Sequence, residues 1–145
     1  MLQGDGIPRP ALAIGLMALL PFVILLILVF SLPSAGRLVQ AFLSYAALLA
    51  ALLGGAHWAL ATGAYGSARR RDELLFGLVP LLAAWLALLM PPTTGLTFLI
   101  AGFFLILLRD ALTVEGFAPW FLRLRSYIAA VAIVSSTMML IRTIS

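Results

Sequence analysis

Residues 11–32 read ALAIGLMALLPFVILLILVFSL, an apolar run that contains no charged side chain. A hydrocarbon core of roughly 30 Å is crossed by about 20 such residues in an α-helix. The run is too long for the apolar part of a cleaved signal peptide, and Pro33 is badly placed for cleavage after Ala35. Residues 11–32 therefore predict a transmembrane helix.

Four more apolar runs of comparable length follow, each bounded by Gly, Pro or charged residues. The five predicted helices cover residues 11–32, 38–62, 74–90, 95–112 and 124–144. The whole chain is 64% hydrophobic and 10% charged, whereas a globular domain is about 45–50% apolar and about 25% charged. We therefore expect an all-α protein, with residues 1–145 forming one domain of five transmembrane helices.

The arginines are distributed unevenly between the two sides of this predicted topology. One side holds seven of them, namely Arg9, Arg69, Arg70, Arg71, Arg109, Arg123 and Arg125. The other side holds Arg37 and Arg142. Because cytoplasmic loops keep the excess of positive charge, we expect a cytoplasmic N-terminus and a C-terminus outside. The expected location is a bacterial inner membrane, or the mitochondrial inner membrane if the protein is eukaryotic.

The second predicted helix, residues 38–62, carries small residues at helical spacing. Those that predict helix packing are Ala47, Ala51, Gly54, Gly55 and Ala59. Helices in lipid associate through small side chains, which allow their backbones to approach closely. We expect this helix to lie at the centre of the bundle.

Ionisable residues at membrane depth are candidates for function, because burying them is costly. His57, the single histidine of the chain, lies beside Trp58, while Arg109 and Asp110 end the fourth predicted helix. These four residues predict a proton or ligand contact. The alternative is structural: a neutral imidazole bonded between helices, and an anchoring network in which Asp110 pairs with His57, Arg123 or Arg125.

The aromatic stretch between the last two predicted helices suggests an interfacial segment. Pro119, Trp120, Arg123 and Arg125 predict either anchoring at the membrane surface or docking of a partner protein.

Asp72 and Glu73 precede the third predicted helix, and we interpret both as acids that stabilise its positive N-terminus. Pro21 and Pro80 lie inside predicted helices and predict kinks.

Several classes of chemistry lack their residues in this sequence. The absence of cysteine excludes disulfides, thiolate metal sites and iron–sulfur clusters. No acid near His57 in sequence completes a catalytic triad, and no glycine-rich loop is suited to phosphate. The positive charge is confined to short segments between the long apolar runs, which indicates membrane topology rather than nucleic-acid binding. We predict a protein that is not an enzyme, with no cofactor and no metal.

Residues 44–45 (SY), 53–59 (LGGAHWA) and 116–125 (GFAPWFLRLR) resemble the transmembrane protein 69 family. Its members are small multi-span proteins of bacterial inner membranes and mitochondria, and they carry a domain of unknown function. The family pattern has a Tyr where this chain has Phe121, so any role of that hydroxyl is lost here. The resemblance implies a fold and a membrane location but no reaction.

Two functions fit these features. The first is an accessory or assembly subunit that contacts lipids and other membrane protein subunits, within a larger respiratory or photosynthetic complex. The alternative is a small carrier or binding bundle that uses His57 for a proton, a quinone-like molecule or another hydrophobic ligand.

Overall fold

The structure, a computed structural model, describes residues 6–33, 36–62, 70–112 and 117–144. Within these ranges the chain forms five helices: α1 (Arg9–Ser31), α2 (Gly36–Thr62), α3 (Arg70–Leu89), α4 (Pro92–Leu112) and α5 (Pro119–Ile144). All five are long and apolar enough to cross a membrane. The predicted all-α multi-pass fold is therefore confirmed. Predictions for Arg69, for the side chain of Arg70 and for residues 113–116 lie outside what the structure describes.

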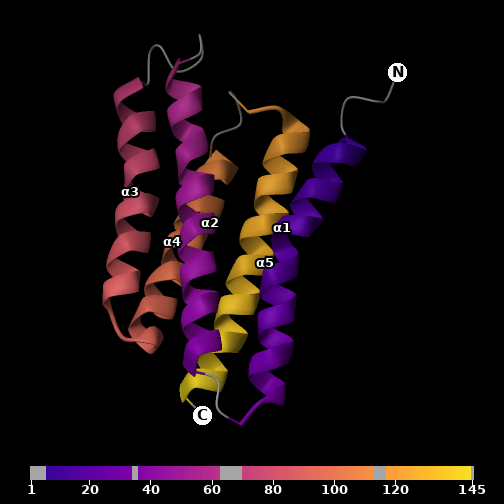
Figure 1. Cartoon of the computed structure of the whole chain (residues 1–145). Coiled ribbons are helices and arrows are strands. Elements are labelled where there is room, and N and C mark those ends of the chain that lie inside the picture. The colour runs from indigo at the N-terminus through magenta and orange to yellow at the C-terminus, as the bar shows by residue number, and fades with distance from the viewer. Residues whose placement is uncertain (1–5, 34–35, 63–69, 113–116, 145) are drawn as a thin grey trace.

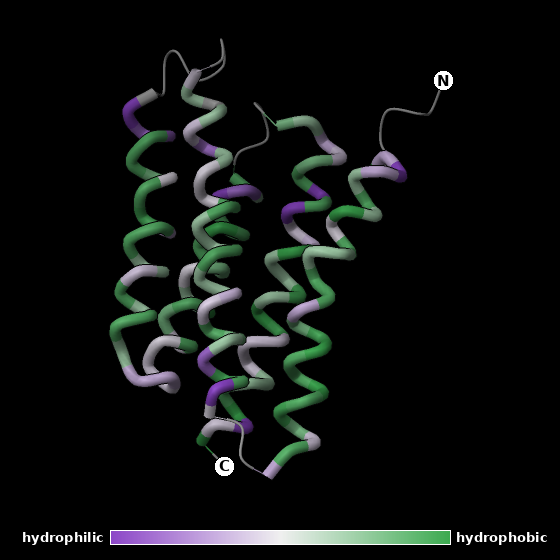
Figure 2. The backbone as a smooth tube through the Cα atoms, viewed as in Figure 1, coloured by the Kyte–Doolittle hydropathy of each residue, from purple (hydrophilic) through white to green (hydrophobic). Residues whose placement is uncertain are grey.

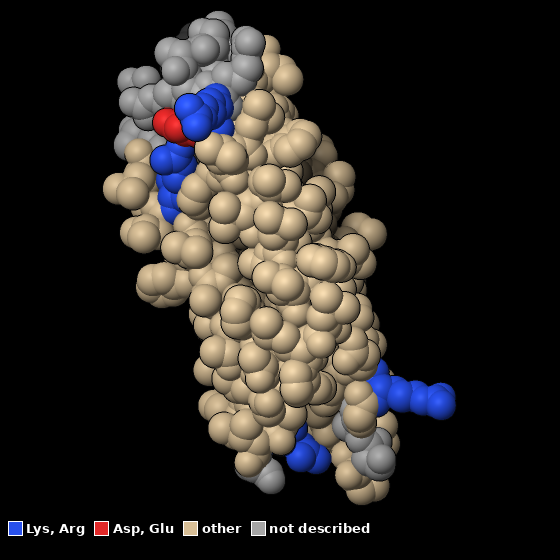
Figure 3. All heavy atoms as spheres, turned by 90° about the vertical axis from the view of Figure 1, so that its left-hand side faces the viewer, with Lys and Arg blue, Asp and Glu red and all other residues tan. Residues whose placement is uncertain are grey.

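The helices run up and down, so that the two termini lie at opposite ends of the bundle (Figure 1). Hydrophilic residues lie mostly toward the ends of the helices, and apolar residues fill the lengths between them (Figure 2). Charged side chains of both signs gather at the end where α1 begins (Figure 3). We call this end, formed also by the end of α2 and the beginning of α3, the charged end.

All five helices begin before their predicted bounds, and in α4 and α5 the first residue is a proline. α4 begins at Pro92 rather than near Gly95, and α5 begins at Pro119 rather than near Leu124. Proline suits the first helical position because the N–H that it lacks would have no partner there. Residues interpreted as a surface segment therefore form the first turns of α5.

α2 contacts each of the other described helices, so its predicted central position is confirmed. Ala47 and Gly54 are buried, whereas Gly55 and Ala59 are exposed. A spacing of four residues advances the position around a helix by about 40° at each step. The predicted stripe therefore turns from the interior of the bundle, near Ala47, to its outer surface by Ala59.

α1 is held to α2 by a cluster of aromatic side chains. The ring of Phe22 lies 5.0 Å from that of Phe42 and 5.2 Å from that of Tyr45. The Tyr45 hydroxyl also donates a hydrogen bond to the carbonyl oxygen of Ala18, one turn before Pro21. Toward the charged end α1 leans away from α2 (Figure 1).

α2 and α3 pack closely against each other through Gly54 and Gly77. A Cβ atom on Gly54 would lie 2.9 Å from the ring of Pro80 and 3.1 Å from the carbonyl oxygen of Gly77. A Cβ atom on Gly77 would lie 2.9 Å from the carbonyl oxygen of Gly54 and would also meet Trp58. Backbone cannot move aside as a flexible side chain can, so glycine is required at both positions.

Gly54→Ala should therefore destabilise the bundle by about 1–3 kcal/mol, because the added methyl group pushes α3 away from α2. Gly55→Ala is the matched control, since a Cβ atom there meets nothing within 4 Å. Denaturation in mixed micelles, followed by circular dichroism, measures both variants. Equal stabilities of the two would contradict the close contact.

Candidate functional site

Five ionisable side chains meet near the charged end, contributed by four helices. They are His57 of α2, Glu73 of α3, Arg109 and Asp110 of α4, and Arg125 of α5. We call them the ionic cluster. All except Arg109 are buried, with exposed fractions from 0% to 3%. Ionisable groups this deep in a membrane bundle are stable only when they are paired with one another.

His57 lies between two carboxylates, one at each ring nitrogen. Its Nδ1 lies 2.6 Å from Oε2 of Glu73, and its Nε2 lies 3.6 Å from Oδ1 of Asp110. A carboxylate only accepts hydrogen bonds, so the proton of a neutral ring lies on Nδ1. The buried Nε2 then has no hydrogen-bond partner within the described residues.

Asp110 and Arg125 form a two-point ion pair behind the histidine. The Nε–H of Arg125 donates to Oδ2 of Asp110 at 2.9 Å, and its Nη2 donates to Oδ1 at 3.2 Å. The guanidinium also lies over the ring of Phe117, 4.8 Å from its centre, and 5.8 Å from that of Phe121. A paired carboxylate and aromatic faces are what allow an arginine to be buried.

Arg109 closes the other side of the ionic cluster. Its Nη2 donates to Oε1 of Glu73 at 3.0 Å, so that both oxygens of this carboxylate are occupied. Its guanidinium lies 5.1 Å from the ring centre of Phe76, and its side chain is 24% exposed. Arg109 is therefore the member of the ionic cluster that reaches the protein surface.

The charges of the ionic cluster balance when His57 is neutral, because two guanidinium groups face two carboxylates. Protonation of His57 adds one positive charge in a region from which water is excluded. A buried charge without a counter-ion costs several kcal/mol. The protonation state of His57 therefore sets the net charge of the whole site.

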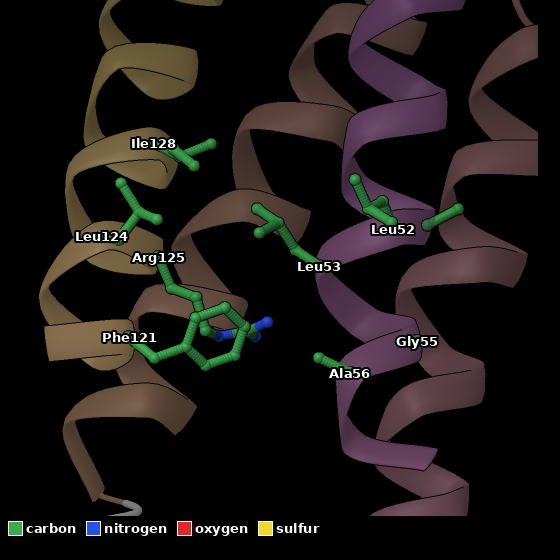
Figure 4. Close-up of a pocket in the computed structure, with 9 residues that line it drawn as sticks. Leu52, Leu53, Gly55, Ala56, Phe121, Leu124, Arg125 and Ile128 are labelled. Carbon is green, nitrogen blue, oxygen red and sulfur yellow. The ribbon is translucent and has the colours of Figure 1, made fainter. Parts of the chain in front are cut away.

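A cavity of about 640 Å³ opens between α2 and α5 beside the ionic cluster. Its walls are mostly apolar and include Leu53, Ala56, Phe121, Leu124 and Ile128. Arg125 is the charged side chain that lines it, and Figure 4 shows it reaching from α5 toward α2 beside Phe121. Leu52 and Gly55 at the rim are exposed, so the cavity opens on the lipid-facing surface.

The structure brings three of the four predicted contact residues together: His57, Arg109 and Asp110 belong to the ionic cluster. Trp58 does not join them, because its Nε1 donates to the carbonyl of Leu74 on α3 at 3.0 Å and its side chain is 49% exposed. Of the partners considered for Asp110, Arg125 forms the ion pair, with His57 close by.

The residues predicted to form an interfacial segment separate by depth. Pro119 and Arg123 are exposed, and Trp120 is half-buried with its ring 5.6 Å from that of Phe121. Arg125 is instead 1% exposed. The proline that starts α5 gives Arg125 a helical position, and the helix directs its side chain into the bundle.

The sequence predicts that Glu73, like Asp72, stabilises the start of a helix, but Glu73 is fully buried and bonds to His57 and Arg109. The signal that identifies it is the spacing along α3. Glu73 is followed at helical intervals by Gly77, Pro80, Ala84 and Ala87, and all of these are buried. The acid therefore continues the face of α3 that packs on α2, whereas Asp72 points outward.

No group of three or more His, Cys, Asp or Glu side chains suited to hold a metal ion is found among the residues that the structure describes. The carboxylates of the ionic cluster face arginines instead.

A family model described as a protein of unknown function (DUF3429) matches residues 7–141 of the chain. No curated protein and no solved structure matches it. The match covers α1 to α4, all of α5 except its last three residues, and the whole ionic cluster. The resemblance to the transmembrane protein 69 family stays a prediction.

Proposed function

The chain belongs to the DUF3429 family, whose function is unknown, and from its site we propose a membrane-embedded binding protein or carrier, without enzymatic activity, for a small hydrophobic molecule with a polar head. The cavity between α2 and α5 carries this proposal. Its volume of about 640 Å³ lies within the roughly 300–1,000 Å³ that is usual for small-molecule sites.

The lining of the cavity supports an amphipathic ligand. Apolar walls suit a hydrocarbon or ring system, and a single charged group at the inner side suits one polar head. The opening toward lipid gives such a molecule a route in without crossing water. His57 is not part of the lining, and it is connected to the cavity through Asp110 and Arg125.

The accessory-subunit hypothesis stays a prediction. Exposed apolar side chains cover the described helices, but contact with lipid accounts for them whether or not a partner protein is present. We also propose that the charged end faces the cytoplasm of a bacterial cell, or the mitochondrial matrix. The excess of arginine there supports this orientation.

Ala56→Phe should fill the cavity and weaken binding of decanol, a neutral amphipathic probe, at least about tenfold. Ala59→Phe is the matched control, because Ala59 is exposed on the same helix and does not line the cavity. Isothermal titration of the two variants in zwitterionic nanodiscs, with thermal unfolding to confirm folding, measures the difference. If wild type binds no decanol, or if both variants bind it like wild type, the proposed function is wrong.

A further inference from the structure

The hydrogen bonds of Arg125 leave one part of its guanidinium unoccupied. Nε and Nη2 bond to Asp110, and no hydrogen bond to Nη1 is found in the described part of the chain. Arg125 is nonetheless 1% exposed and lines the cavity. A guanidinium nitrogen at the wall of a cavity suits the oxygen of a ligand, because it is a hydrogen-bond donor.

His57 has a buried ring nitrogen, Nε2, that forms no hydrogen bond among the described residues. Glu73 lies at Nδ1 and Asp110 at Nε2, so a neutral ring directs the lone pair of Nε2 toward a carboxylate. Protonation turns this nitrogen into a donor and gives it Asp110 as an acceptor. The cost is one uncompensated positive charge, because the four other groups of the ionic cluster already balance.

The helices packed against α2 bring charged groups of both signs to this end. α3 contributes Glu73 at the ring and Asp72, which is exposed and lies beside Arg109. α4 contributes Arg109 and Asp110, and α5 contributes Arg125. The only ionisable side chain of α1, Arg9, is its first residue and is positive. Among the described residues, Glu73 and Asp110 are the carboxylates that contact the His57 ring, and the cavity beside Arg125 is a place where a ligand can bring a further negative charge.

We propose that the cavity binds an amphipathic monoanion, with its acidic head on Nη1 of Arg125 and its apolar tail along α2 and α5, and that binding is coupled to uptake of one proton by His57. This inference rests on the proposed binding function. The anion neutralises the charge that protonation adds, and the protonated ring in turn shares Asp110 with Arg125. Head and proton therefore stabilise each other through Asp110 and Arg125.

The single histidine makes the proton directly observable. Protein labelled with ¹⁵N at histidine is placed in zwitterionic nanodiscs, at a pH where the ring nitrogens of the free protein report a neutral imidazole. Decanesulfonate is the probe because its head stays ionised, and decanol is the neutral match. We expect decanesulfonate to shift both ring nitrogens to the imidazolium pattern and decanol to leave them unchanged.

Titration calorimetry at two pH values provides the second measurement. Affinity for decanesulfonate should fall by up to about tenfold for each unit of rising pH while the free ring is neutral, and His57→Gln should abolish this dependence. Decanesulfonate bound beside a neutral ring, or a ring that is imidazolium without ligand at every pH, would overturn the proton coupling and leave the binding function standing. Binding of neither probe would overturn both.

Discussion

Asp110→Ala should lower the free energy of unfolding by about 3–5 kcal/mol, because it leaves Arg125 buried without its counter-ion. Both hydrogen bonds that orient the guanidinium disappear in this variant. His57 also loses the carboxylate beside Nε2. Unfolding by titration with a denaturing detergent in mixed micelles measures the loss.

Two further variants separate the ion pair from a general effect of charge. Arg123→Ala removes an exposed arginine from α5, the helix that carries Arg125, and should lower the free energy of unfolding by less than about 1 kcal/mol. Asp110→Leu combined with Arg125→Met removes both charges and should restore most of the lost stability, since apolar replacements of similar volume often match a buried ion pair. If Asp110→Ala is no more costly than Arg123→Ala, the buried pair does not stabilise the bundle.

The double variant also bears on why the ionic cluster exists. A bundle that is equally stable with apolar residues at positions 110 and 125 does not need these charges for folding. If the cavity binds an anion on Arg125, the double variant keeps its fold but loses affinity for decanesulfonate, because no guanidinium remains at the cavity wall. Stability then depends on the volume of the side chains at positions 110 and 125, whereas binding depends on the charge of Arg125.

The fold could be predicted from the sequence because the bilayer imposes a length on each helix. Five apolar runs of adequate length give five helices. The small side chains within residues 38–62 predict the central position that α2 has in the bundle. The residues at which the helices begin are harder to predict from the sequence. Pro92 and Pro119 look like loop residues in the sequence, although proline is also well suited to begin a helix.

The site was only partly predictable, for a physical reason. His57, Arg109 and Asp110 stand out because ionisable residues are rare at membrane depth. Their partners depend on how four helices are rotated against one another, and no local pattern in the sequence fixes those rotations. For this reason the sequence predicts a surface position for Arg125, although its Nε lies 2.9 Å from Oδ2 of Asp110 in the interior.

Glu73 and its neighbour Asp72 test whether the local helix start or the packing of the helices determines the role of a charged residue. Both are acids at the start of α3, where the helix dipole favours negative charge. Glu73 is fully buried, whereas Asp72 is exposed. If the helix start alone governs these acids, removing either charge should have a similar and small effect. If the ionic cluster governs Glu73, the two effects should differ widely.

Glu73→Gln should therefore cost about 2–3 kcal/mol of stability, while Asp72→Asn should change it by less than about 0.5 kcal/mol. Glutamine keeps the shape of the side chain and one acceptor oxygen, but it removes the charge that Arg109 and His57 share.

The two guanidinium groups of the ionic cluster then face one carboxylate, so the cluster already carries the positive charge that protonation of His57 otherwise adds. For this reason Glu73→Gln should also bind decanesulfonate without moving the histidine ring to its imidazolium form. Unfolding in mixed micelles and the ¹⁵N spectrum of His57 measure the two effects, and equal costs for the two substitutions would show that burial of Glu73 adds nothing to its role at the helix start.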